Sequence, residues 1–331
     1  MLVVANALKS TDLPRGAIAT IGNYDGIHRG QRAILDLVVA RARAAGTPSM
    51  VVTFEPHPLS VLRPDQAPLR VTTQVQKERL LDAIGIDVVA VVRFTPELAQ
   101  MPARRFVRDV LHERLKLKEI YVGSRFVFGH QREGDLSLLR EMGKTFGFEA
   151  FGVEEVLHRG EPVSSTRIRR AIHDGSVEDA WELLGRPFAI EGLIARGDRM
   201  GKRLGWPTIN VVPDHELLPA DGVYASRVYF PSFPATFDCV TNIGTRPTMY
   251  ENYQRVVESH ILGFHSDVYG ERVELNFLKR LREERVFPSV MDLSEQIGRD
   301  VEATREYFQA RRRLEESIED AELRRPETKE T

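Results

Sequence analysis

Residues 17–31 read Ala-Ile-Ala-Thr-Ile-Gly-Asn-Tyr-Asp-Gly-Ile-His-Arg-Gly-Gln, a short apolar run followed by a glycine-rich turn. Beyond the turn, apolar residues from Ile34 to Ala42 recur at helical spacing, and Gly46 supplies a stop signal. A strand that passes through a turn into a helix is the repeating element of an α/β fold. This stretch therefore predicts one strand of a parallel sheet, with the turn at the edge where ligands bind.

The rest of the first half repeats this pattern. Strand-like runs fall at residues 50–54, 87–92 and 120–122, and helical spacing appears at 78–84, 106–111 and 138–142. Strands separated by helices of this length imply right-handed crossovers. We expect a doubly wound parallel sheet.

The pattern changes at Gly185-Arg186-Pro187, a strong chain breaker. Short β-type runs separated by turn residues follow, at 190–195, 208–212, 223–229, 237–242, 256–262 and 273–277. Such spacing predicts a compact antiparallel barrel, and a helix with a charged tail is expected after Pro288. We therefore predict an α/β domain over residues 1–186 and a β-barrel domain over residues 187–331.

Composition narrows the classes of protein. With 331 residues, 42% hydrophobic and 28% charged, the chain suits two globular domains. No apolar run reaches the ~18 residues of a membrane helix, and the N-terminal residues lack the basic segment of a secretory signal. A single cysteine, Cys239, suits a reducing compartment. A net charge of −2 lacks the excess of positive charge that is typical of proteins that bind nucleic acid. We expect a cytoplasmic monomer or weak homo-oligomer that binds small molecules, without nucleic-acid or membrane partners.

The glycine-rich turn is a candidate phosphate site. The first amides of a helix and its dipole attract anions, and glycines let the backbone approach a phosphate. His28 could donate a hydrogen bond to that phosphate; an ordinary glycine turn is the alternative. The other candidate residues of this turn are Gly22, Asn23, Asp25, Gly26, Gly30 and Gln31.

Two further segments could complete this site. Residues 163–170 place three hydroxyls beside three arginines at a helix start, which suits either a triphosphate clamp or ordinary capping. His57 and Pro58 follow a predicted strand; His57 could instead be a satisfied loop histidine. The candidates in the first segment are Ser164, Ser165, Thr166 and Arg169.

Together these segments resemble the nucleotidyltransferase half of the bacterial bifunctional riboflavin kinase/FAD synthetases. Residues 197–210 (Gly-Asp-Arg-Met-Gly-Lys-Arg-Leu-Gly-Trp-Pro-Thr-Ile-Asn), 218–225, 242–248 (Asn-Ile-Gly-Thr-Arg-Pro-Thr) and 258–262 resemble the kinase half, in the same order. The resemblance implies two reactions. The barrel would phosphorylate riboflavin to FMN with ATP, and the α/β domain would join FMN to the AMP part of a second ATP, giving FAD and pyrophosphate.

The resemblance also assigns roles in the kinase half. Thr208 and Asn210, which alternate along a predicted strand and so share a face, would hold Mg²⁺ against ATP. Glu258 would be the general base. Three glycines suit a flap over the phosphates, and Arg246 would help to order the site; the glycines are Gly197, Gly201 and Gly205.

Two positions depart from the family pattern. Gln31 stands where a second histidine is usual, and Arg125 where Asp or Asn is usual. We hypothesise that Arg125 partly replaces the missing charge; the alternative is a riboflavin kinase whose impaired N-terminal domain is retained for nucleotide binding or regulation. A non-enzymatic flavin sensor or RNA-binding protein is disfavoured by the intact Thr208, Asn210 and Glu258. An aminoacyl-tRNA-synthetase-like enzyme would have no place for the barrel motif.

Overall fold

A computed structural model describes residues 1–197, 201, 204–246 and 254–323. The chain divides into two compact units. The first unit comprises Met1–Arg169 and Leu183–Gly185, and the second comprises Arg170–Glu182 and Arg186–Thr331. Along the chain, the segments of the two units thus alternate between residues 170 and 186. The single domain boundary after residue 186, expected from the sequence, stays a prediction.

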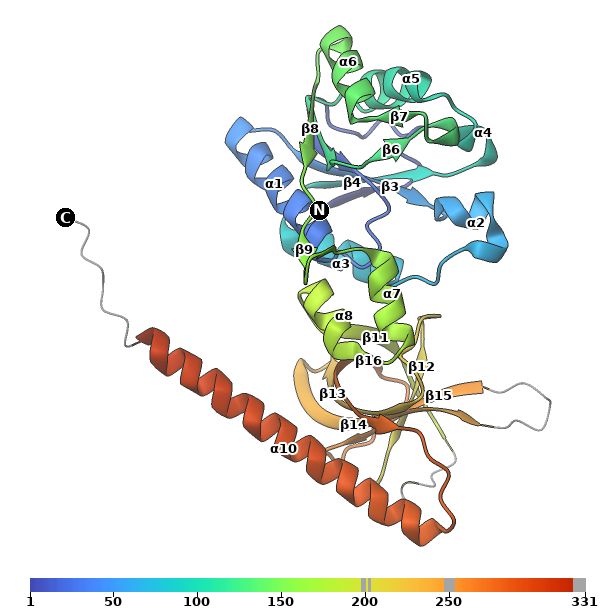
Figure 1. Ribbon diagram of the computed structural model, residues 1–331, viewed down its shortest axis with the longest axis vertical. Coiled ribbons are helices and arrows are strands. Elements are labelled where there is room, and N and C mark those ends of the chain that lie inside the picture. The colour runs from blue at the N-terminus through green and yellow to red at the C-terminus, as the bar shows by residue number, and fades with distance from the viewer. Residues whose placement is uncertain (198–200, 202–203, 247–253, 324–331) are drawn as a thin grey trace. The chain divides into compact units, whose positions relative to one another are not determined.

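The first unit is built on a six-stranded sheet in which every neighbouring pair is parallel (Figure 1). Its strand order is β1-β4-β3-β2-β5-β8. This confirms the predicted α/β class. The strands are β1 (Leu2–Val4), β2 (Ile18–Ile21), β3 (Ser49–Glu55), β4 (Val88–Arg93), β5 (Glu119–Gly123) and β8 (Glu149–Val153).

Helices connect these strands, one small hairpin lies between β5 and β8, and a second follows β8; the last two helices named below come after the sheet, where the chain passes into the second unit. The hairpins pair β6 (Val127–Phe128) with β7 (Gly134–Asp135), and β9 (Leu157–His158) with β10 (Glu161–Pro162). The helices are α1 (Arg29–Ala45), α2 (Pro58–Leu62), α3 (Gln74–Ile84), α4 (Pro96–Ala99), α5 (Ala103–Arg105), a π-helix (Phe106–Arg114), α6 (Leu136–Phe146), α7 (Ser165–His173) and α8 (Val177–Leu184). Short 3₁₀ turns occupy Pro64–Gln66 and His130–Arg132.

Strand alternation supplies a core on both faces of this sheet. On β3, Met50 and Val52 belong to one buried cluster, whereas Val51 belongs to a second cluster with Leu35 of α1 and Leu81 of α3. Successive side chains of a strand point to opposite faces, so a strand covered on both sides reads as a continuous apolar run. The same packing fixes α1 and α3 on one face.

The second unit is a closed six-stranded barrel with strand order β11-β12-β15-β14-β13-β16. Every neighbouring pair is antiparallel, as the sequence predicts. The strands are β11 (Phe188–Ala195), β12 (Ile209–Pro213), β13 (Gly222–Phe230), β14 (Ala235–Arg246), β15 (Gln254–Ile261) and β16 (Arg272–Glu283), followed by the expected helix, α10 (Val290–Leu323).

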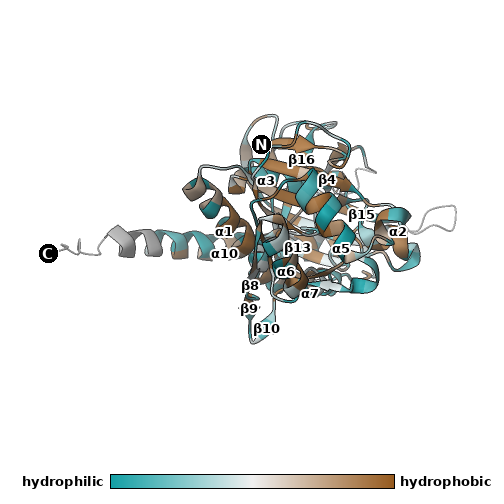
Figure 2. Cartoon of the chain, turned by 90° about the horizontal axis from the view of Figure 1, so that it is seen from above, coloured by the Kyte–Doolittle hydropathy of each residue, from teal (hydrophilic) through white to brown (hydrophobic). Residues whose placement is uncertain are grey.

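Helix α10 packs on the barrel through two buried side chains. Val301 joins a cluster with Val223 and Val240, and Phe308 joins one with Ala225. Figure 2 shows strands such as β4 and β16 in the hydrophobic colour, whereas much of the C-terminal part of α10 is hydrophilic. Over the described residues, no helix combines the length and apolar character needed to cross a membrane.

Candidate active sites

The glycine-rich turn of the first unit leads directly from β2 into α1. His28 is the N-cap of α1: its Nδ1 accepts a hydrogen bond from Gln31 N (3.3 Å), and His28 N donates to Gln31 Oε1 (3.1 Å). Because Nδ1 is an acceptor, a neutral imidazole carries its proton on Nε2. Gln31 is therefore occupied in capping the helix. A Cβ on Gly30 would lie 3.3 Å from the His28 ring, so glycine leaves room for the imidazole.

Three residues of this turn adopt left-handed backbone conformations: Tyr24 (φ 49°), Gly26 (φ 93°) and Ile27 (φ 41°). Such conformations are unfavourable for residues other than glycine and persist where packing over-determines them. Tyr24 and Ile27 are each 3% exposed, in the cluster that includes Leu35 and Leu81. The core thus holds the turn in a conformation that it would not adopt alone.

Asp25 connects the turn to two distant segments. Its Oδ1 accepts hydrogen bonds from Val71 N (2.9 Å) and Thr72 N (3.2 Å), and its Oδ2 lies 2.7 Å from Arg169 Nη2. The Asp25 carbonyl accepts from Ser165 Oγ (2.8 Å). Both carboxylate oxygens are thus engaged within the protein, and Asp25 holds Ser165 and Arg169 against the turn.

The remaining residues of the serine- and arginine-rich segment do not converge on the turn. Ser164 Oγ accepts from Arg167 N (3.3 Å), a capping bond, and Thr166 is exposed. Arg167 Nη1 donates to the carbonyls of Glu161 and Pro162 (2.9 Å each). Arg170 is exposed. Of the three arginines, Arg169 is the one that the structure brings to the turn.

His57 lies beside the turn, two residues beyond the end of β3, the strand next to β2. Its Nδ1 accepts from Leu59 N (3.2 Å) as the N-cap of α2, which begins at Pro58, and its Nε2 lies 3.1 Å from the Asn23 amide nitrogen. Burial lowers the pKa of His57, while the Asp25 carboxylate acts in the opposite direction. Because Nδ1 accepts from Leu59 N, a neutral ring carries its proton on Nε2, and Asn23 would accept that proton's hydrogen bond with its amide group turned by 180°.

The structure adds a buried lysine to this site. Lys77 on α3 is 6% exposed, and its Nζ donates to the Asn23 carbonyl (3.0 Å). Burial lowers its pKa, whereas Asp25 and Glu55 act to raise it. The sequence carries a signal for this residue, since Lys77 precedes Leu81 and Ile84 at helical spacing and so shares their buried face.

Arg125 follows β5 and forms an ion pair with Glu155 (Nη2 to Oε2, 2.6 Å), with 74% of its side chain exposed. Glu155 lies beyond β8, and β8 and β2 flank β5 on opposite sides. The ion pair therefore directs the guanidinium toward the β8 side and away from the glycine turn.

In the barrel, strand register brings the predicted kinase residues together. Asn210 of β12 is directly opposite Glu258 of β15, and Glu258 is in turn opposite Asn242 of β14. Directly opposite side chains share a face of the sheet, with Cβ atoms about 4.5–5.5 Å apart. We call Asn210, Glu258 and Asn242 the polar rung. Thr208 precedes β12 by one residue and reaches the same end of it.

Two of the flap glycines pack on these side chains. A Cβ on Gly197 would lie 2.3 Å from Asn210 Nδ2, and one on Gly201 would lie 3.2 Å from Thr208 Oγ1 and 2.4 Å from the Trp206 carbonyl. Gly205 has φ 83°, which favours glycine. Residues 198–200 and 202–203 lie outside the described part of the chain, as does the side chain of Arg246, which ends β14.

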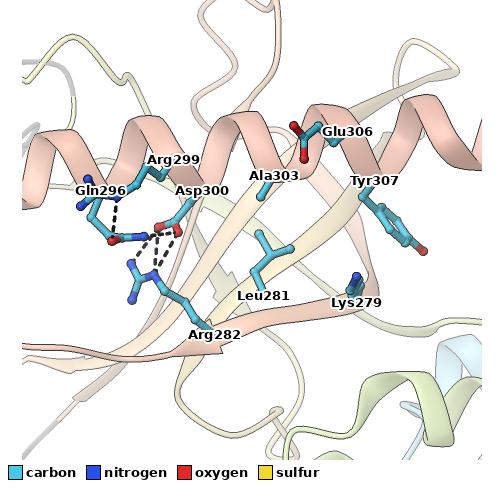
Figure 3. Close-up of a pocket in the computed structure, with 9 residues that line it drawn as sticks. All are labelled: Lys279, Leu281, Arg282, Gln296, Arg299, Asp300, Ala303, Glu306 and Tyr307. Atoms are coloured by element: carbon cyan, nitrogen blue, oxygen red, sulfur yellow. Dashed lines mark hydrogen bonds and ion pairs between the residues drawn. The ribbon is translucent and has the colours of Figure 1, made fainter.

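Two cavities in the described part of the chain lie on the barrel. One, of about 340 Å³, is lined by Thr208, Ile209, Ser259, Ile261 and residues 264–269. It includes Thr208, whereas Ile209 and Ser259 form the rung next to Asn210 and Glu258 and face the other side of the sheet. The other, of about 470 Å³, lies between β16 and α10 (Figure 3). It contains none of the sequence-predicted site residues. Its buried Arg282–Asp300 ion pair (2.8 Å), joined by Gln296, fastens α10 to the barrel.

Comparison with known proteins identifies both units. The family model described as FAD synthetase matches residues 10–167, and that described as riboflavin kinase matches residues 184–308. The bifunctional riboflavin kinase/FMN adenylyltransferase of Escherichia coli is 39% identical over 293 residues, which is 88% of this chain and 93% of that protein. The enzyme of the same name from Pseudomonas fluorescens is 38% identical with the same coverage.

The fold comparison covers the chain as well. A crystal structure from Streptococcus pneumoniae, described as a macrolide-efflux protein, superposes with a TM-score of 0.83 at 28% identity and covers 92% of this chain and 99% of that one. The two family models and the bifunctional relatives support the two-activity interpretation and not the kinase-only alternative. The chain thus belongs to the bifunctional riboflavin kinase/FMN adenylyltransferase family, with an FAD synthetase domain followed by a riboflavin kinase domain.

Proposed function

We propose that this chain makes FAD from riboflavin in two ATP-dependent steps. The second unit transfers the γ-phosphoryl group of ATP to the ribityl 5′-hydroxyl of riboflavin, and the first unit joins the resulting FMN to the AMP part of another ATP. The polar rung carries the proposal for the kinase step, because it places a carboxylate beside an oxygen donor on one face of the barrel.

In the kinase step, Glu258 accepts the proton of the ribityl hydroxyl while the hydroxyl oxygen attacks the γ-phosphorus; the bond from that phosphorus to its bridging oxygen breaks, and ADP leaves. Thr208 and Asn210 offer hard oxygen donors of the kind that Mg²⁺ prefers, and the glycines packed on them leave space that a side chain would fill. When bound, Mg²⁺ neutralises phosphate charge. We place the phosphates of ATP beside Thr208 and Asn210; Thr208 also lines the 340 Å³ cavity.

In the adenylyl step, a phosphate oxygen of FMN attacks the α-phosphorus of ATP, and the bond to the departing pyrophosphate breaks. The N-terminus of α1 and the Nε2–H of His28 stabilise the phosphate charge. Gln31 keeps His28 in place as the second half of the capping box. We propose Gly22, Asn23, Gly26, Gly30, Ser165 and Arg169 as the other phosphate-site residues, with Asp25 holding Ser165 and Arg169 in place and with His57 and Pro58 ordering the flavin side. Ser164 and Thr166 stay predictions for this site, although neither converges on the turn.

Arg125 remains a candidate for partial replacement of the missing imidazole charge. Its exposed ion pair with Glu155 counts against that role, because the guanidinium would first have to leave Glu155. Measuring FAD formation by Arg125→Asn decides the matter: a fall supports compensation, and an increase or no change rejects it.

The proposed function is tested by incubating the protein with riboflavin, ATP and Mg²⁺, then separating riboflavin, FMN and FAD by chromatography. We expect both FMN and FAD. Glu258→Gln should abolish FMN formation yet still convert supplied FMN into FAD. His28→Ala should still form FMN from riboflavin but should no longer convert FMN into FAD. Accumulation of FMN without FAD would reject the adenylyltransferase assignment, and the absence of both products would reject the kinase assignment too.

The same proposal places the protein in the cytoplasm as a monomer or weak homo-oligomer that acts on small molecules, without a nucleic-acid partner. A reducing compartment agrees with the lone thiol of Cys239, which is buried in the barrel. The net charge of −2 agrees with small-molecule substrates.

A further inference from the structure

Lys77 is a buried cation of the first unit's site that forms no ion pair with the described residues. It is 6% exposed, and among the described residues its ammonium has one hydrogen-bond partner, the Asn23 carbonyl. An ammonium has three N–H donors. Removing a charge from water costs several kcal/mol unless it is paired and hydrogen-bonded. A lysine held in this way therefore calls for a ligand or a compensating charge.

The neighbouring carboxylates are already paired with other cations. Asp25 contacts Arg169 (2.7 Å), and Glu55 contacts Arg70. Glu78, the residue after Lys77, points in another direction around the helix and accepts a hydrogen bond from Gln74 (2.7 Å). Asp25 and Glu55 are thus each paired with an arginine, and within the described part of the site the Lys77 ammonium has no ion pair of its own.

Lys77 is also connected to the groups that would contact the reactants. Its partner, the Asn23 carbonyl, belongs to the turn that leads to His28, and the Asn23 side chain contacts His57 (3.1 Å). Thr53 Oγ1 donates to the same carbonyl (3.3 Å), so two hydrogen bonds fix this peptide. Movement of Lys77 would therefore move both Asn23 and its contact to His57.

We propose that Lys77 is a positioning residue for FMN adenylylation: its ammonium fixes the Asn23 peptide, and its positive charge, which forms no ion pair of its own, favours binding of the phosphate groups of FMN and ATP at the turn. The inference rests on the proposed adenylyltransferase activity of the first unit. It also identifies a fixed charge in a site where Gln31 cannot carry one.

Three substitutions separate charge from hydrogen bonding. Lys77→Met removes both, Lys77→Gln keeps a donor without charge, and Lys77→Arg keeps charge and donors. Lys144→Met is the matched control, since Lys144 is exposed on α6 in the same unit. Each variant is assayed as the full chain for FAD formation from FMN and ATP and for riboflavin phosphorylation, and unfolding of the first unit is followed by far-UV circular dichroism.

We expect Lys77→Met and Lys77→Gln to lower kcat/KM for FAD formation by about 10²-fold, the effect of misplacing reacting groups by about 1 Å. Lys77→Arg should recover at least a tenfold part of this loss, and riboflavin phosphorylation should not change. Wild-type activity in Lys77→Gln would overturn the proposal, as would a loss in Lys77→Met that a lowered thermal midpoint explains. A wild-type chain that makes FMN but no FAD would instead refute the function on which the proposal rests.

The pH profile gives a readout that a purely structural role would not change. Burial lowers the pKa of Lys77, with Arg70 acting in the same direction and Asp25, Glu55 and Glu78 in the opposite one. FAD formation should therefore decline on the alkaline side as the ammonium loses its proton, at a pH below that of an ordinary lysine. In Lys77→Arg this decline should move to higher pH. An unchanged alkaline limb in Lys77→Arg would overturn the role of the charge.

Discussion

Replacing Gly197 by alanine should damage the kinase and spare the adenylyltransferase. The added Cβ would lie 2.3 Å from Asn210 Nδ2 and 2.6 Å from its Cγ, whereas ordinary contact begins near 3.4 Å. The Asn210 side chain must therefore move by about 1 Å, a displacement that can cost about 10²-fold in rate. At about 1.36 kcal/mol per tenfold, this is about 2.7 kcal/mol of lost transition-state stabilisation.

The assay compares two reactions of one purified chain: riboflavin to FMN, and supplied FMN to FAD. Gly197→Ala should lower kcat/KM for the first about 10²-fold and leave the second unchanged, because Gly197 and Asn210 both lie in the second unit. Gly298→Ala is the matched control. Its Cβ would lie 3.5 Å from Trp206, an ordinary contact, and alanine in a helix should be stabilising by up to about 1 kcal/mol.

A wild-type rate of riboflavin phosphorylation in Gly197→Ala would refute the reasoning, because Asn210 could then be displaced without consequence. A parallel loss of both activities would do the same, since it would mean global damage. The tryptophan signal checks the fold of the second unit, because Trp181 and Trp206 both belong to it and the chain has two tryptophans.

Three further predictions concern buried groups. Asp25→Asn should destabilise the first unit by about 3–5 kcal/mol, because it leaves the Arg169 side chain, which is 18% exposed, without its ion pair. Thermal unfolding followed by circular dichroism should then show a lower midpoint, while the tryptophan fluorescence transition of the second unit should not change. Arg282→Met should lower the free energy of unfolding of the second unit by about 3–5 kcal/mol, because it leaves the buried Asp300 carboxylate without its ion pair. Urea unfolding followed by tryptophan fluorescence measures this loss. Recovery of stability in Arg282→Met combined with Asp300→Leu would show that the unpaired charge is the cause. Burial raises the pKa of the Cys239 thiol to about 12, so the thiol stays protonated at pH 8 and should react with a disulfide reagent only after unfolding; reaction of the native protein would contradict this.

Periodic segments of the sequence predict the elements of both units closely. The apolar run at 223–229, for example, corresponds to β13 (Gly222–Phe230), and the turn residues between such runs separate the barrel strands along the chain. The edge strand β1 (Leu2–Val4) was not predicted, because three residues with two exposed side chains carry no alternation to detect. Local sequence patterns predict only those helices and strands that are long enough to show a repeating hydrophobic period.

Site residues were harder to predict where their roles depend on distant contacts. Asp25 is expected from the sequence to bind phosphate, yet its carboxylate contacts Val71, Thr72 and Arg169, which no local pattern links to it. Lys77 lies on the apolar face of its helix, which the sequence already shows. A lysine at such a position is easily taken for one whose stem packs on the apolar face while its ammonium stays in water. Asn210 and Glu258 of the polar rung were predicted as site residues from their motifs, whereas Asn242 joins them only through the pairing of β14 with β15.

The register of the polar rung limits how such an enzyme could acquire a new substrate. In a closed barrel each strand is paired on both sides, so a strand that slipped by one residue would turn Glu258 to the opposite face and break two ladders at once. Selection for a different acceptor alcohol would therefore leave the strands intact. Its substitutions and insertions would accumulate in connections such as residues 262–271, where length can change without altering the strand pairing.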